Sequence, residues 1–303
     1  MRFPSSTPAD EMLSRRETLK LALAAPAVSA LVSESPMATD SESASFRIID
    51  TNISLFQWPF QRLPLDTIPE LVRRLRSLGV TQAWAGSFEG LLHRDTTAVN
   101  NRLAEACIDC SDLIPIGSIN PMLPGWQEDL ERCLQHHQMP GVRLHPNYHG
   151  YVLTDNPFIE LLKRCSDSGC FVQIAVSMED NRTQSTLVQA ADVDLSPLGD
   201  VLSHMPAVRV QLLNCRLRPA QLGPVRHLSN VTLDTARVDG TDAIPQLVKA
   251  VGQERVLFGS HSPFLIPEAA MIRVHESQQL DTASLSAIYR DNALQFAAGE
   301  SIS

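Results

Sequence analysis

The 303-residue sequence lacks the features that mark several common classes of protein. No apolar run reaches the ~20 residues that a helix needs to cross a bilayer. No glycine-rich phosphate loop follows the first apolar strand, and no Gly-x-Ser-x-Gly elbow is present. Basic residues are not in excess, because the formal net charge is −9. These absences argue against stable membrane insertion, a nucleotide-binding open sheet, a serine hydrolase and nucleic acid as a partner.

The first forty residues differ in composition from the rest of the chain. The basic pair Arg15-Arg16 precedes a short apolar run, within which Val28-Ser29-Ala30 supplies a small-x-small cleavage site. This arrangement is typical of an export signal of the twin-arginine type. We therefore expect residues 1–38 to be a signal peptide and linker, with Met1 or Met12 as the start, and the mature protein to be periplasmic. A disordered or amphipathic tail is the alternative.

The six cysteines, at positions 107, 110, 133, 165, 170 and 215, are not expected to form disulfides. Twin-arginine export carries proteins that have already folded in the cytoplasm, so folding precedes any oxidising compartment. Cys107 and Cys110 form a CxxC pair, but no second pair accompanies it. The sequence therefore predicts structural thiols.

From residue 46 onward, short apolar strands alternate with longer helical patterns. The expected strands are Phe46–Asp50, Val80–Trp84, Ile114–Ile119, Val142–His145, Phe171–Ala175, Val208–Leu213, Val231–Thr235 and Val256–Phe258. Eight strands alternating with helices over roughly 250 residues predict an α/β fold, a parallel (β/α)8 TIM barrel. An open doubly wound sheet is the alternative, which the missing phosphate loop makes less favourable.

Side chains alternate along barrel strands, and this alternation predicts which of them face the interior. We expect Ile49 and Thr51 to face the helices. The side chains expected in the lumen are largely polar: Asp50, Asn52, Ser54, Arg143, His145 and Gln173. Because a charge buried there must be paired, we expect an ion pair between Asp50 and Arg143.

Five segments, taken in order, resemble the amidohydrolase-related metal-dependent hydrolases. They are Ile48–Ser54, Gly141–Pro146, Val172–Ala175, Val231–Thr235 and Phe258–Pro263. The resemblance covers nearly all of residues 46–298, which we take as one domain. It implies a TIM barrel with its active site at the carboxyl ends of the strands.

The resemblance also implies a metal site, but the metal ligands do not carry over. The family's first strand ends in His-x-His, where this chain has Asn52 and Ser54. The histidines of the family's fifth and sixth strands correspond to Ala175 and Asn214, and the catalytic aspartate of its eighth strand corresponds to His261. Catalytic zinc takes about three nitrogen, sulfur or carboxylate ligands. The sequence therefore predicts no ordinary metal site, and no cofactor is assigned.

Three interpretations of the strand ends remain open. In the first, the chain is a hydrolase of a small carboxylate, amide or lactone, with a non-standard or absent metal site. Its general base is His145 or His261, which Asp234 orients. Fold-level analogy also leaves room for decarboxylation of a small carboxylate. The groups expected to bind the substrate are Asn52, Arg143, Asn147, Tyr148, Asn214 and Arg182.

In the second interpretation, the barrel is catalytically inactive and binds a small polar or anionic ligand. In the third, His145, His149, His261 and Asp234 rebuild a zinc or manganese site at a new position. The segment Trp58-Pro59-Phe60 is expected to be a lid or wall over the mouth, or else a packing anchor. A homo-oligomer is compatible with the sequence, and a small molecule is the partner we expect.

Overall fold

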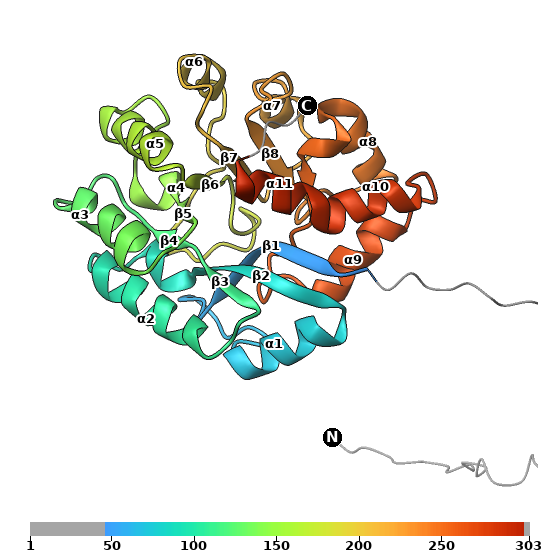
Figure 1. The fold of residues 1–303 in the computed structure, drawn as a ribbon, viewed down its shortest axis with the longest axis horizontal. Helices are drawn as coiled ribbons and strands as arrows, with labels where there is room; N and C mark the ends of the chain where they lie inside the picture. Colours follow the sequence, from blue (N-terminus) through green and yellow to red (C-terminus); the bar gives the residue numbers. More distant parts are fainter. Residues whose placement is uncertain (1–45, 300–303) are drawn as a thin grey trace, which may run out of the picture. The chain divides into compact units, whose positions relative to one another are not determined.

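The computed structural model describes residues 46–299, and Figure 1 shows their fold. The predicted signal peptide, residues 1–38, lies outside the described residues. None of the helices within the described range is long and apolar enough to cross a membrane.

Parallel strands form the centre of the fold. The strands are β1 (Ile48–Leu55), β2 (Val80–Ser87), β3 (Leu113–Pro115), β4 (Gly117–Ser118), β5 (Gly141–Leu144), β6 (Phe171–Ala175), β7 (Val210–Leu213), β8 (Val231–Asp234) and β9 (Val256–Leu257). They pair in two sheets, β1-β2-β3 and β4 through β9, and within each sheet every strand is hydrogen-bonded to the next along the chain. Each predicted strand matches one of these, except that the third is split in two.

Backbone hydrogen bonds join the two sheets along both seams. Between β3 and β4, Ile116 donates its N–H to the Ala85 carbonyl of β2 at 2.9 Å. On the other side, β1 bonds to the segment that follows β9: Thr51 donates to the Phe258 carbonyl at 2.9 Å, and Asn52 accepts from the His261 N–H at 2.8 Å. The strands therefore follow the (β/α)8 order of a TIM barrel, as predicted.

Helices surround the strands (Figure 1). They are α1 (Ile68–Ser77), α2 (Thr96–Ile108), α3 (Trp126–Glu131), α4 (Pro146–His149), α5 (Asn156–Ser168), α6 (Leu198–Ser203), α7 (Pro219–Leu222), α8 (Ala243–Val251), α9 (Pro267–His275), α10 (Thr282–Ser286) and α11 (Asn292–Ala298). Short 3₁₀ or π turns lie at Phe88–Leu91, Arg132–His136, Gln253–Arg255 and Ala287–Asp291.

Helix α5 shows how local sequence sets these elements. A proline stands in its first turn, where a missing N–H costs nothing, and Gly169 ends it in the left-handed conformation with φ 71°. Its buried residues, Phe158, Leu161, Leu162 and Cys165, recur at the three- and four-residue spacing of one helix face. That face packs on the barrel. The cysteines of the described range are free, as predicted.

An aromatic cluster fills the barrel interior toward the amino-terminal ends of the strands. Trp84 stacks on Phe171 with 4.9 Å between ring centroids, and Phe171 lies 5.2 Å from Phe296 of α11. Ile49 belongs to this same cluster. Helix α11 therefore covers the end of the barrel opposite the predicted site.

The expected orientation of β1 is wrong at two positions. Ile49 lies in the interior aromatic cluster, and the Thr51 hydroxyl accepts a hydrogen bond from the buried Gln211 side chain at 2.7 Å. The register between β1 and β2 shifts after Ile48 and again between Asp50 and Ile53. Such irregularities interrupt the two-residue alternation on which the expectation rested.

Phe296 tests the role of α11. It is 1% exposed, so Phe296→Ala is expected to lower the free energy of unfolding by ~3–5 kcal/mol, through lost burial and a residual cavity. Leu294→Ala, on the same helix but 41% exposed, is the matched control and is expected to cost ~1 kcal/mol or less. Urea unfolding of both variants measures this. Equal losses would show that α11 is not part of the barrel core.

Candidate functional site

Arg143 of β5 lies in the centre of the barrel and is 2% exposed. Its Nε donates to Gln173 Oε1 at 2.8 Å, and its Nη1 donates to the Ile53 carbonyl at 2.8 Å and to Ser54 Oγ at 3.2 Å. Gly86 leaves room for the guanidinium, because a Cβ at that position would lie 2.5 Å from Nη1. Burial lowers the pKa of Arg143 to about 10.

The predicted ion pair between Asp50 and Arg143 is absent from the described range, where the hydrogen-bond partners of Arg143 are all uncharged. Asp50 Oδ1 instead accepts the N–H groups of Asn52 at 3.1 Å and Ser260 at 2.9 Å. The altered alternation of β1 accounts for the difference. Asp50 Oδ2 is buried with no hydrogen-bond partner among residues 46–299, and burial raises the pKa of Asp50 to about 6.

Three side chains at the carboxyl ends of β1, β7 and β8 bind one another, and we call them the Asn–Asp clasp. Asn52 Nδ2 donates to Asp234 Oδ2 at 2.6 Å and to Asn214 Oδ1 at 2.9 Å. Asp234 Oδ1 accepts the N–H of Asn214, whose φ is 61°, at 2.9 Å. Gly259 allows the close approach, since a Cβ there would lie 2.9 Å from Asp234 Cβ. Burial raises the pKa of Asp234 to about 6.

His261 reaches the same end of the barrel from the segment after β9. Its Nε2 lies 2.8 Å from the Met178 carbonyl, which fixes the proton on Nε2 and leaves the lone pair on Nδ1. Within the described range Nδ1 is buried and unpartnered. Burial lowers the pKa of His261 to about 3, so the ring is neutral at pH 7.

His145 follows β5 and is also neutral. Burial lowers its pKa well below the ordinary value, and positive charge on His149, Arg143 and His261 would lower it further. The rings of His145 and His149 lie 5.8 Å apart. His149 Nε2 meets the Gly90 carbonyl at 2.9 Å, so its lone pair is also on Nδ1.

An aromatic roof covers these groups. Trp58 packs edge-on against Phe60, Phe88 and Phe264 at centroid distances of 5.1 to 5.5 Å, and Phe264 stacks on His261 at 5.1 Å. His145 and His261 are each 1% exposed beneath it. The segment from Trp58 to Phe60 is therefore a packed wall over the mouth.

Comparison with known proteins decides the family. A family model described as amidohydrolase matches residues 50–296. This chain belongs to the amidohydrolase family. No curated protein matches it by sequence.

Several solved structures resemble this chain over most of its length. One is 5-carboxyvanillate decarboxylase from Novosphingobium aromaticivorans with bound manganese: 14% identity, TM-score 0.66, covering 84% of this chain and 97% of that chain. Another is 2,6-dihydroxybenzoate decarboxylase from Rhizobium, with 11% identity and a TM-score of 0.65. The match covers 83% of this chain and 98% of that chain. A third is a dihydroxybenzoic acid decarboxylase from Polaromonas with bound manganese, with 14% identity and a TM-score of 0.65. The match covers 83% of this chain and 96% of that chain. At these identities the likeness shows the fold alone.

The donor set of this family member does not fit a divalent metal. Across residues 46–299, no three His, Cys, Asp or Glu side chains gather in a way that would hold a metal ion, so the structure does not support a site rebuilt from His145, His149, His261 and Asp234. In the clasp, Asn52 directs its amide N–H groups at Asp234 and Asn214, where a metal would require lone pairs.

Two predicted roles differ in the structure. The Met178 carbonyl, not Asp234, orients His261. Arg182 lies on the surface with 88% of its side chain exposed, paired with Asp180, so it does not reach the buried site. Asn147 donates to the Ala191 carbonyl at 2.8 Å and ties two loops together. Tyr148 is half-buried beside the aromatic roof, and burial raises its pKa.

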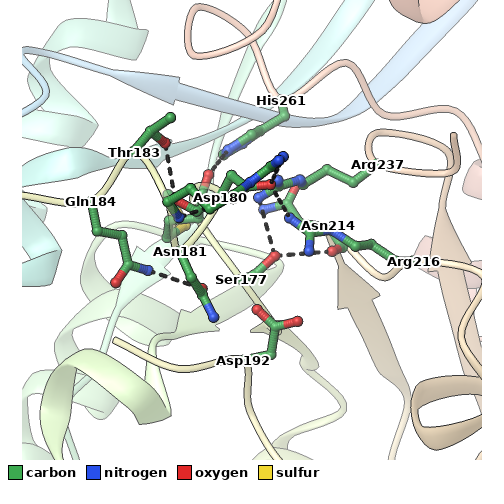
Figure 2. A network of polar contacts seen from close by, with 12 residues as sticks. Ser177, Asp180, Asn181, Thr183, Gln184, Asp192, Asn214, Arg216, Arg237 and His261 are labelled. Atoms are coloured by element: carbon green, nitrogen blue, oxygen red, sulfur yellow. Dashed lines mark hydrogen bonds and ion pairs between the residues drawn. The ribbon is translucent and has the colours of Figure 1, made fainter. Parts of the chain in front are cut away.

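Ser177 and Arg237, to which the sequence assigned no role, join the clasp to the rim (Figure 2). Ser177 Oγ donates to the Asn214 carbonyl at 3.3 Å and accepts from Arg237 Nη1 at 3.3 Å. Arg237 is 9% exposed, and burial lowers its pKa. Both residues follow strand ends by two or three positions, which is the signal that would have selected them.

Asp50 gives a pH-dependent prediction. Its pKa is higher in the folded chain, about 6, than the unfolded value of 3.8, so its stabilising contribution is full below pH 3.8 and is lost as pH rises through about 6. Asp50→Asn removes this titration. Relative to the parent protein, the variant is expected to gain ~2–3 kcal/mol in free energy of unfolding between pH 4 and pH 8. Urea unfolding across that range measures the difference, and a constant difference would contradict the assignment.

Proposed function

We propose that this amidohydrolase-family chain is an enzyme that converts a small carboxylate substrate at the clasp end of the barrel, by acid–base catalysis without a bound metal. The observation that carries the proposal is a set of buried polar atoms with no partner in residues 46–299. They include the acceptor His261 Nδ1, the donors Asn214 Nδ2 and Trp58 Nε1, and His145 Nδ1. Unmade buried hydrogen bonds are costly, so atoms of both kinds at one strand end favour a ligand that satisfies them.

The titratable groups support proton transfer. Burial keeps the imidazoles of His145 and His261 neutral, while it raises the pKa of both Asp50 and Asp234 to about 6. Neutral bases therefore lie in the same barrel as carboxyl groups that retain protons toward neutral pH. Environments that push acids and bases in opposite directions are the arrangement that acid–base enzymes use.

Decarboxylation of a planar aromatic carboxylate is the reaction we favour. The similar structures named above are decarboxylases of hydroxylated benzoates. The aromatic roof of Trp58, Phe60 and Phe264 offers flat apolar surfaces suited to such a ring. In this reaction the bond to the carboxylate breaks, its electron pair stays on the ring carbon, and that carbon takes a proton. Because burial raises their pKa to about 6, Asp50 and Asp234 keep a proton to higher pH than an exposed aspartate does and can supply this proton.

Hydrolysis of an amide or lactone is the second candidate. His261 Nδ1 presents a fixed lone pair for a water proton, and Asn214 Nδ2 presents free N–H groups for a developing oxyanion. The inactive binding barrel is less favourable, since amidohydrolase membership and enzymatic relatives support turnover.

Either reaction requires the mouth to open. His145 and His261 are each 1% exposed under the aromatic roof, so a substrate must displace part of the roof. Periplasmic export of the mature protein is a further part of the proposal, and a homo-oligomer is compatible with it.

His261 tests the proposal. His261→Asn keeps a side chain of similar shape but removes the ring base, and is expected to lower kcat by ~10²–10⁴ on the active substrate. The screen offers 2,6-dihydroxybenzoate and related hydroxybenzoates, followed by the matching amides and lactones. Carbon dioxide release scores decarboxylation, and loss of the amide or lactone scores hydrolysis.

His136→Asn is the matched control, because His136 is exposed at the end of the π turn that follows α3. It is expected to leave turnover unchanged. Thermal unfolding of both variants separates catalytic loss from misfolding. Full activity in a folded His261→Asn protein would refute the assignment of the base.

A further inference from the structure

Two of the free cysteines flank the turn between helix α5 and strand β6. Cys165 lies in the last turn of α5, and Cys170 directly precedes β6. Between them Gly169 adopts the left-handed conformation, with φ 71°, and the Cys170 N–H donates to the Cys165 carbonyl at 3.1 Å. With the bond from the Gly169 N–H to the Ser166 carbonyl at 3.2 Å, this is a Schellman cap. In such a cap the side chains of the first and last residues are frequently in contact.

The sulfur atoms of this pair do make contact. The Cys165 thiol donates a hydrogen bond to the Cys170 sulfur. Ser168 Oγ lies 3.7 Å from the same sulfur. Arg209 donates from Nη2 to the Gly169 carbonyl, which places its guanidinium beside the turn. The Cys170 sulfur therefore has a thiol donor, a hydroxyl neighbour and a nearby positive charge, and such surroundings favour a thiolate.

These contacts give the two thiols opposite preferences for a proton. The hydrogen bond from Cys165 lowers the pKa of Cys170, and the Ser168 hydroxyl and Arg209 lower it further, although burial opposes them. The same hydrogen bond, together with burial, raises the pKa of Cys165 well above its ordinary value. One sulfur is therefore a nucleophile, and the other remains a thiol beside it. A reactive cysteine with a second thiol next to it is the arrangement in which a sulfenic acid condenses to a disulfide.

The CxxC pair of Cys107 and Cys110 provides an internal comparison. Its Cys110 N–H donates to the Cys107 carbonyl at 3.1 Å, so the backbone links this pair as well. Burial, however, raises the pKa of Cys107 to about 12, and that of Cys133 likewise to about 12. These two sulfurs therefore stay protonated and unreactive at neutral pH.

The exposure of the pair limits which oxidant can reach it. Cys170 is 6% exposed and Cys165 is fully buried, while Ser168 and Gly169 of the turn are exposed. This small exposed part of Cys170 suits a compact oxidant such as hydrogen peroxide and not a bulky disulfide. The pair lies at the amino-terminal end of β6, and thus at the opposite end of the barrel from the clasp.

We propose that Cys165 and Cys170 form a peroxide-oxidised dithiol site, in which Cys170 reacts first and Cys165 resolves the product. The Cys170 thiolate attacks one oxygen of hydrogen peroxide, the O–O bond breaks, and the leaving hydroxide takes up the proton that Cys170 had released, which gives water. Cys170 is then a sulfenic acid. The Cys165 sulfur attacks the Cys170 sulfur, the S–O bond breaks, and the departing hydroxide takes the Cys165 proton to form a second water. One peroxide is reduced and two thiols are oxidised to one disulfide.

The site goes beyond the proposed function and does not depend on it. Treatment of the purified, fully reduced protein with hydrogen peroxide tests it, with intact mass and peptide mapping as readouts. We expect a loss of about 2 Da, the mass of two hydrogen atoms, which dithiothreitol reverses. Asp167 lies between the two cysteines, so cleavage before aspartate in the denatured, thiol-blocked protein separates them unless a disulfide joins the peptides. The expected product is one linked pair of peptides that carries Cys165 and Cys170.

Two variants assign the roles of the two sulfurs. Cys170→Ala is expected to form no disulfide. Cys165→Ala is expected to accumulate the Cys170 sulfenic acid, which the 1,3-diketone dimedone traps as a stable adduct. Cys110→Ala is the matched control, because Cys110 is a half-buried cysteine of the comparison pair, and it is expected to form the disulfide at the rate of the parent protein. Thermal unfolding before treatment checks that each variant is folded.

The peroxide-treated parent protein is itself decisive, whatever the variants do. Absence of a disulfide in it, or a disulfide between any other two cysteines, would overturn the proposal. So would a rate of disulfide formation that Cys110→Ala lowers as much as Cys170→Ala does.

Discussion

The hydrogen bond from the Asn52 amide to Asp234 is the contact on which the rest of the site depends. It is 2.6 Å long, is completely buried, and together with Asn214 ties the carboxyl ends of β1, β7 and β8. The resemblance to metal-dependent hydrolases assigns metal-ligand positions to Asn52 and Asn214. In this chain a neutral amide donates to the carboxylate there. Side-chain hydrogen bonds therefore join the strand ends that a bound cation would otherwise join.

That replacement changes the electrostatics of the barrel. A divalent cation would keep nearby carboxylates ionised. Here burial dominates, so the pKa of Asp234 and that of Asp50 rise to about 6, and the pKa of His261 falls to about 3. The buried guanidinium of Arg143 has only uncharged hydrogen-bond partners in the described range. The raised pKa of the carboxyl groups and the neutral imidazoles support the proton transfer that we propose.

Much of the fold could be predicted from sequence because its signals are local. Apolar runs and their spacing identified the strands, and the resemblance of Phe258–Pro263 to the family's closing strand located His261. Sequence could not predict that the side chains of Ile49 and Thr51 point into the barrel, because the register shifts in β1 depend on its pairing with β2. The predicted ion pair between Asp50 and Arg143 was wrong for the same reason. The role of Met178 in orienting His261 was also out of reach, because a backbone carbonyl carries no sequence signature until the loop that holds it is placed.

In this chain the clasp does the structural work that we would otherwise expect of a metal ion. Elemental analysis of the purified protein for zinc and manganese tests this, paired with thermal unfolding before and after dialysis against a chelator. We expect far less than one metal ion per chain and the same Tm in both samples. One tightly bound ion per chain, with a Tm that falls on chelation and recovers when that ion is returned, would contradict it.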